Sequence, residues 1–131
     1  MAITYSETQE FEPDALQDLF LAVEWEVGNY PDRLVVALAN SDTVYSAWDA
    51  DRLIGLINAL DDGVLTAYVH FLLVHPDYQS QGIGKELMRR MIAQYQDVLR
   101  MVLTADDSEA EFYQKMGLRP SQGTIMLGGT I

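Results

Sequence analysis

One segment, Val74-His75-Pro76-Asp77-Tyr78-Gln79-Ser80-Gln81-Gly82-Ile83-Gly84-Lys85, sets the architecture of this 131-residue chain. It has the pattern of a strand end, a turn and two glycines that open a helix. The first N–H groups of a helix have no partner inside it and lie at the positive end of its dipole. Glycine also allows close approach of a bound group. The segment therefore predicts a backbone site for an anion such as a pyrophosphate.

Other nucleotide-binding motifs do not account for these glycines. Position 87 is Leu, so the pattern G-x-G-x-x-G is incomplete, and no G-x-x-x-x-G-K-[ST] is present. The alternative to an anion site is that Gly82 and Gly84 only ease the packing of a helix on a strand.

Hydrophobic periodicity around the segment predicts the remaining elements. Strands are expected over residues 3–8, 43–48, 53–60, 65–74, 101–104 and 124–127. Four helices are expected: one that starts at Asp14, one over residues 31–40, one from Gly82 through Tyr95 and one over residues 108–116. Asp14 and Gln17 have the spacing of a capping box at the start of the first helix. Asp61-Asp62-Gly63 favours a hairpin turn over a metal site. The order predicts an α/β protein of the α+β type, with a mixed, mostly antiparallel sheet and about four helices.

Length and composition restrict the function classes. The chain is expected to form a single domain over residues 1–131, because this length supports one hydrophobic core. The absence of cysteine excludes disulfides, a thiolate nucleophile and cysteine-ligated zinc. No apolar run is long enough to span a bilayer and no leader is evident, so no membrane partner and a cytoplasmic location are expected.

The charge distribution points to a cationic partner. Eight basic and twenty acidic residues give a net charge of −12, which argues against nucleic acid. Residues 1–65 carry thirteen acids and two bases, a charge of −11. A solvated acidic surface is the alternative explanation.

Two ordered motifs resemble those of the GNAT N-acetyltransferases. Gln79-x-x-Gly82-x-Gly84, preceded by Leu73-Val74-His75-Pro76, is similar to the family's acetyl-CoA signature. Glu111-Phe112-Tyr113-Gln114-Lys115-Met116-Gly117-Leu118 resembles its F-Y-x-x-x-G-F block. The resemblance covers essentially the whole chain. It implies a GNAT fold whose sheet is splayed between the fourth and fifth strands, with acetyl-CoA as co-substrate in the cleft and no metal.

The resemblance also assigns the acetyl-CoA contacts. It implies that the pantetheine arm binds the main chain of Leu72, Leu73 and Val74. The loop that Gln79 opens would hold the pyrophosphate through Gln81, Gly82, Ile83, Gly84 and Lys85. Asp106 stands where an asparagine often contacts pantetheine, and an ionised aspartate accepts hydrogen bonds but cannot donate them.

Catalytic roles follow from the same resemblance. Tyr113 falls on the family tyrosine that acts as general acid toward the CoA sulfur; the alternative is an aromatic ring packed under the cofactor. His70 matches a strand histidine of serotonin N-acetyltransferases, which suggests a base that acts directly or through water; the alternative is a half-buried structural histidine. Strand alternation places Tyr68, His70, Leu72 and Val74 on one side.

The expected acceptor is a small primary amine. Trp25 and Tyr30, between the first two helices, and Tyr68 would line its pocket and favour an arylalkylamine or polyamine; alternatively the two loop aromatics belong to the core. The expected reaction is direct attack of the amine on acetyl-CoA in a ternary complex. A protein or peptide N-acetyltransferase, a non-catalytic acyl-CoA-binding module and an acidic interaction domain are the alternatives. A homodimer is left open.

Overall fold

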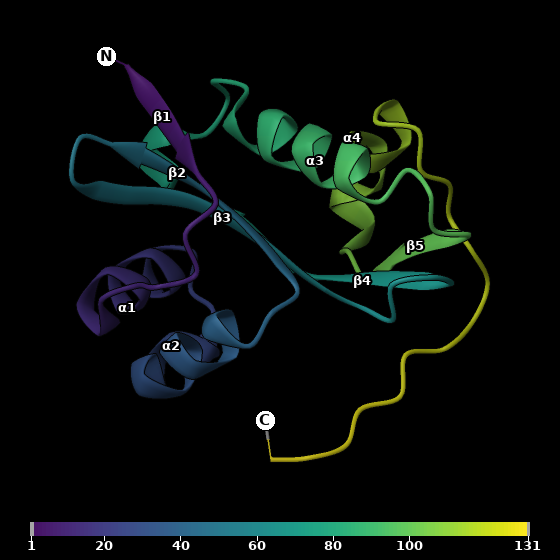
Figure 1. Ribbon diagram of the computed structural model, residues 1–131, viewed down its shortest axis with the longest axis horizontal. Coiled ribbons are helices and arrows are strands. Elements are labelled where there is room, and N and C mark those ends of the chain that lie inside the picture. The colour runs from purple at the N-terminus through teal and green to yellow at the C-terminus, as the bar shows by residue number, and fades with distance from the viewer. Residues whose placement is uncertain (1, 131) are drawn as a thin grey trace.

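The computed structural model of the protein describes residues 2–130. Its main elements are β1 (Ile3–Ser6), α1 (Pro13–Ala22), α2 (Pro31–Ala39), β2 (Thr43–Asp49), β3 (Arg52–Asp61), β4 (Thr66–Val74), α3 (Ile83–Gln94), β5 (Arg100–Leu103) and α4 (Ala110–Lys115) (Figure 1). Short 3-10 turns join them: η1 (Glu26–Asn29), η2 (Pro76–Tyr78) and η3 (Asp107–Glu109).

The five strands form one mixed sheet in the order β1-β2-β3-β4-β5. The pairs from β1 to β4 are antiparallel, and β4 and β5 are parallel. Helices α1 and α2 cover one face of the sheet, and α3 and α4 cover the other (Figure 1). The predicted α/β class and antiparallel meander are confirmed.

Two hydrophobic clusters, one on each face, form the core. Leu56 of β3 packs with α1 and α2, and Ile57 packs with α3. β3 is thus buried on both faces, which explains its nearly continuous apolar sequence.

The sheet opens between β4 and β5. The two strands pair only from Thr66 to Val69 of β4, whereas β3 accompanies β4 as far as Val74. Residues 71–74 of β4 consequently have a strand neighbour on one side alone in the described chain. The expected splay between the fourth and fifth strands is confirmed, and it leaves a free main-chain edge.

Two local predictions are wrong. Asp14 and Gln17 form no capping box, because Pro13 already starts α1; the Gln17 side chain donates instead to the Gly28 carbonyl at 3.1 Å. Residues 124–127 form no strand, and the whole of 119–130 is exposed without regular secondary structure. Strand propensity is not enough here, because no strand edge lies alongside this segment to pair with it.

Candidate active site

An extra residue in β4 shapes the site. Asn58 of β3 pairs with Phe71, but the next residue, Ala59, pairs with Val69, so His70 has no partner on β3. This is a β-bulge. Asn58, only 1% exposed, stabilises it: its side-chain oxygen accepts the Phe71 N–H at 2.9 Å. A buried amide on the neighbouring strand therefore fixes the position of His70.

The bulge also changes which side chains share a face. The rings of Tyr68 and His70 lie 5.7 Å apart, as alternation predicts, and His70 stacks on Phe71 at 3.8 Å. Leu72 and Val74, however, pack in the cluster on the α3 side, not with these rings. Their predicted placement on the same side of the strand as Tyr68 and His70 is wrong, because the extra residue shifts the two-residue period.

A hollow of about 220 Å³ lies where β4 and β5 diverge. It is lined by Trp25, Val69, His70, Leu72, Leu103, Thr104, Ala105, Asp106, Glu109 and Tyr113. The hollow therefore brings together both predicted catalytic residues and three of the predicted binding residues, Trp25, Leu72 and Asp106.

Some predicted and observed positions differ around this hollow. Tyr30 does not line it, and the Arg33 guanidinium lies 5.5 Å from the Tyr30 ring centre. Tyr68 borders His70 but is not a lining residue. Thr104 and Glu109 line the hollow and were missed by the sequence reasoning. Thr104 directly follows β5, and this position is the signal that could have found it, since ligands gather at the carboxyl ends of parallel strands. Glu109 lies further on, at the end of η3, where no such signal marks it.

His70 and Tyr113 are suited to opposite roles in proton transfer. Desolvation in the cleft lowers the pKa of His70 below its ordinary 6.5, so the imidazole is mostly neutral at pH 7. Burial, with a smaller contribution from the negative charge of Glu109, raises the pKa of Tyr113 to about 12. One cleft therefore holds a group able to accept a proton and a group able to donate one.

The loop after β4 exposes main-chain groups. Ser80 and Gly82 have left-handed φ angles of 65° and 83°. The Gln79 side chain, a predicted cofactor contact, donates to the Val74 carbonyl at 3.0 Å. It thereby ties the loop to the end of β4.

Helix α3 begins directly after Gly82, whose carbonyl accepts the Glu86 N–H at 3.0 Å. The N–H groups of residues 83–85 precede this first helical bond, so the helix itself does not satisfy them. A Cβ at Gly82 would meet nothing within 4 Å, and its left-handed φ is the feature that favours glycine. A Cβ at Gly84 would make ordinary contact with Val74 at 3.7 Å.

The edge of β4 and the glycine loop after it fit acetyl-CoA, the co-substrate that the resemblance implies. Leu72, Leu73 and Val74 lie on the free edge of β4, which leads directly to the loop. An extended amide-containing arm ending in a pyrophosphate matches a strand edge followed by unsatisfied N–H groups.

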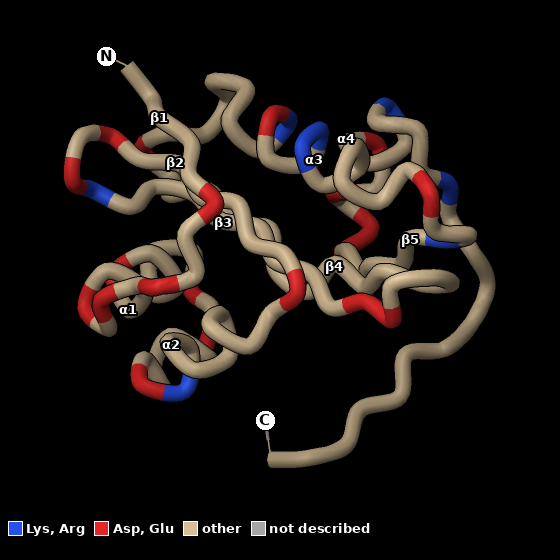
Figure 2. The backbone as a smooth tube through the Cα atoms, viewed as in Figure 1, with Lys and Arg blue, Asp and Glu red and all other residues tan. Residues whose placement is uncertain are grey.

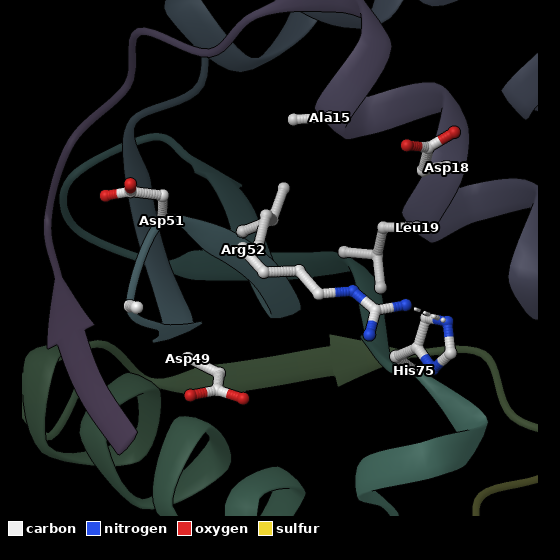
Figure 3. Close-up of a pocket in the computed structure, with 9 residues that line it drawn as sticks. Ala15, Asp18, Leu19, Asp49, Asp51, Arg52 and His75 are labelled. Atoms are coloured by element: carbon white, nitrogen blue, oxygen red, sulfur yellow. Dashed lines mark hydrogen bonds between the residues drawn. The ribbon is translucent and has the colours of Figure 1, made fainter. Parts of the chain in front are cut away.

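A second hollow, of about 550 Å³, lies between α1 and the β2–β3 turn (Figure 3). In it, Arg52 Nη2 lies 3.1 Å from His75 Nε2. The other nitrogen of His75 accepts the Asp77 N–H at 3.1 Å, so His75 shapes the turn. We take the smaller hollow as the site because it joins the proton-carrying residues to the free edge of β4.

The charges are divided between the two sides of the molecule. Acidic residues are spread over α1, α2 and the β2–β3 and β3–β4 turns, whereas most Lys and Arg residues lie on α3, α4 and near β5 (Figure 2). Asp62 is part of a turn: its carboxylate accepts N–H groups from Val64, Leu65 and Thr66, and these hydrogen bonds lower its pKa. Within residues 2–130 no cluster of His, Asp and Glu is arranged to hold a metal ion, and no helix has the length and apolarity to cross a membrane.

Comparisons with known proteins agree with this geometry. The family described as acetyltransferase (GNAT) domain matches residues 13–126. A solved GNAT-family acetyltransferase from Streptococcus pneumoniae superposes with a TM-score of 0.83 and 28% identity, over 97% of this chain and 98% of that one.

Three curated relatives are named for different activities. An uncharacterized ycf52-like N-acetyltransferase of Prochlorococcus marinus is 34% identical over 86% of this chain. Histone acetyltransferase TAP1 of Glycine max is 38% identical over 50%, and the chloroplastic serotonin N-acetyltransferase 2 of Oryza sativa is 29% identical over 79%. The chain spans 66%, 29% and 54% of these proteins, respectively. By the family match and the shared fold, the chain belongs to the GNAT family of acetyltransferases.

Proposed function

We propose that this protein transfers an acetyl group from acetyl-CoA to a small primary amine by direct attack in a ternary complex. One observation carries the proposal: a neutral His70 and a protonated Tyr113 line one hollow at the point where β4 separates from β5. The amine nitrogen would form a bond to the acetyl carbon as the carbon–sulfur bond breaks.

The free edge of β4 and the glycine loop would bind the co-substrate. Main-chain groups of residues 72–74 would contact the pantetheine arm, and the N–H groups of residues 81–85 would contact the pyrophosphate. Asp106 would accept a hydrogen bond from an amide of that arm. When bound, acetyl-CoA supplies the activated acetyl thioester.

Two proton transfers would be handled by the protein. His70 would take a proton from the ammonium group of the acceptor, directly or through one water, because only the neutral amine is a nucleophile. Tyr113 would give its proton to the departing sulfur. Its pKa of about 12 keeps it protonated at every physiological pH.

The lining of the hollow supports a compact cationic acceptor. Asp106 and Glu109 give this wall a negative charge, and Trp25, 36% exposed, presents an aromatic ring. An ammonium with an apolar or aromatic body would be attracted by both. Trp25 also packs on Phe20 and Phe71, at 6.1 and 6.0 Å, so its ring is held in place by the core.

A protein or peptide amine is the second candidate acceptor. It is supported by the partial similarity to a histone acetyltransferase and by the open side of the cleft, where Thr104 and Glu109 are exposed. The cytoplasmic location stays a prediction, since two of the relatives are named as chloroplastic proteins.

An acceptor panel tests the proposal. Thioester cleavage would be followed with tryptamine-like amines, polyamines, amino acids, aminoglycosides and lysine peptides. We expect turnover with the arylalkylamines or polyamines. Turnover confined to lysine peptides would favour the second acceptor, and calorimetric binding of acetyl-CoA without turnover of any amine would indicate an acyl-CoA-binding module.

A further inference from the structure

The larger hollow, between α1 and the β2–β3 turn, is lined by charged side chains that take no part in the proposed acetyl transfer. Its volume of about 550 Å³ is within the range of small-molecule binding sites. The Arg52 side chain extends into the hollow, Asp18 projects from α1, and Asp49 and Asp51 come from the end of β2 and the turn after it (Figure 3). His75 lies directly after β4, next to the Arg52 guanidinium.

Arg52 forms no ion pair in residues 2–130, although three aspartates line the same hollow. Its guanidinium carbon lies 5.7 Å from the centre of the Tyr78 ring, and its Nη2 lies 3.1 Å from His75 Nε2. Asp49 is engaged elsewhere, because it accepts the Tyr78 hydroxyl at 2.5 Å. The guanidinium is therefore held by an aromatic ring and an imidazole, and its N–H donors have no carboxylate partner.

His75 does not supply an acceptor for Arg52 while it caps the turn that follows. Its Nδ1 accepts the Asp77 N–H at 3.1 Å at the start of η2, and the Asp77 carboxylate, 3.9 Å from Nδ1, is too far away for a hydrogen bond. A neutral imidazole has one acceptor and one donor nitrogen, so Nε2 carries the proton. The contact drawn between Arg52 and His75 in Figure 3 thus joins two donors. A negatively charged oxygen placed against both would satisfy them.

The charges around this pair of donors restrict the kind of ligand that fits. Asp18 and Asp51 form no ion pair in residues 2–130 and would repel a phosphate or a dicarboxylate. A ligand that carries a carboxylate and an ammonium group on one carbon is neutral overall and would meet a protein charge of opposite sign for each group. Ala15, Leu19 and Leu53 give the hollow an apolar wall.

We propose that the larger hollow is a second ligand site, which binds a free α-amino acid with an apolar side chain. Arg52 and the Nε2–H of His75 would bind the carboxylate, whose two oxygens suit the fork of a guanidinium. Asp18 and Asp51 would bind the ammonium group, and the side chain would lie against the apolar wall. The two hollows share no lining residue, so binding here does not depend on the acetylation chemistry.

Titration of the isotopically labelled protein with leucine, followed by NMR in the absence of acetyl-CoA, tests the proposal. We expect saturable shifts of the amide signals in residues 15–19 and 49–53. Leucinamide lacks the carboxylate and N-acetylleucine lacks the ammonium group, so each should bind at least about tenfold more weakly than leucine. No saturable shift at millimolar leucine, shifts confined to the smaller hollow, or equal affinity for the three compounds would overturn the proposal.

Variants of the charged residues test the individual contacts. Arg52→Gln should bind leucine at least about tenfold more weakly, and so should the double variant with Asp18→Asn and Asp51→Asn. All three residues are exposed, so the variants should fold, which thermal unfolding checks. Arg33→Gln is the matched control: Arg33 is exposed on α2 beside Tyr30, does not line the hollow, and should leave leucine affinity unchanged. Parental affinity in Arg52→Gln, or an equal loss in Arg33→Gln, would contradict the assigned contacts and overturn the site.

Discussion

Replacing Tyr113 by Phe removes one hydroxyl from the hollow and leaves the ring in place. The ring packs edge-on against Phe112, with centroids 5.0 Å apart, and Phe can keep this contact. Acetyl-CoA affinity should therefore change little. The loss should fall on the step in which the sulfur departs, since Tyr113 is the residue proposed to give the sulfur its proton and Phe has no hydroxyl to replace it.

The size of the effect follows from the role. General acid catalysis typically contributes roughly 10²–10⁴-fold, which corresponds to about 2.7–5.4 kcal/mol in the activation free energy. The raised pKa also predicts the shape of the pH profile. With a pKa of about 12, Tyr113 stays protonated up to pH 10, so turnover should not fall between pH 8 and 10 through loss of this proton.

Single-turnover kinetics with the best acceptor amine is the appropriate assay, because it isolates chemistry from product release. Tyr5→Phe is the matched control: Tyr5 lies on β1, where the Arg90 guanidinium is 4.6 Å from its ring centre, away from the cleft. The control should keep parental rates. If Tyr113→Phe also keeps the parental single-turnover rate, the hydroxyl carries no proton in the reaction and the ring only packs.

Three other changes test neighbouring parts of the site. Because the pKa of His70 is lowered, turnover should rise with pH, reach half of its maximum below pH 6.5 and then level off, provided that His70 limits the rate. His70→Gln should abolish this rise with pH, and an unchanged pH profile would assign the proton transfer to water or to the amine. Gly82→Val should raise the Kd for acetyl-CoA, measured by calorimetry, by about tenfold, since a left-handed φ costs a branched residue about 1–3 kcal/mol. Gly84→Ala is the control and should bind acetyl-CoA almost normally. If Gly82→Val binds acetyl-CoA as tightly as the parent protein, the loop is not part of the binding site. Asn58→Ala should lower the free energy of urea unfolding by about 1–3 kcal/mol and reduce turnover, because the Phe71 N–H at the bulge loses its buried acceptor. A variant as stable as the parent protein would show that the bulge does not depend on this hydrogen bond.

Local sequence signals predicted much of the fold and part of the site. The glycine loop, the helix after it and the meander depend on short-range patterns, and the structure has them. The bulge at His70 could not be predicted this way, because it depends on Asn58 of another strand, twelve positions earlier. Alternation therefore failed beyond His70.

The aromatic residues and the final segment show the same limit. Trp25 and Tyr30 flank one 3-10 turn, yet only Trp25 lines the hollow, since their orientation depends on tertiary packing. Residues 124–127 have a strand-like sequence, but a strand exists only beside another strand.

The transfer of a labelled acetyl group tests the central proposal most directly. The protein would be incubated with acetyl-CoA carrying an isotopic label in the acetyl group and with a tryptamine-like amine or polyamine, and the products would be analysed by mass spectrometry. We expect the label on the amine nitrogen, at a rate that Tyr113→Phe lowers. Unmodified amine after prolonged incubation with the parent protein, with all of the label still in acetyl-CoA, would contradict a small-amine acetyltransferase.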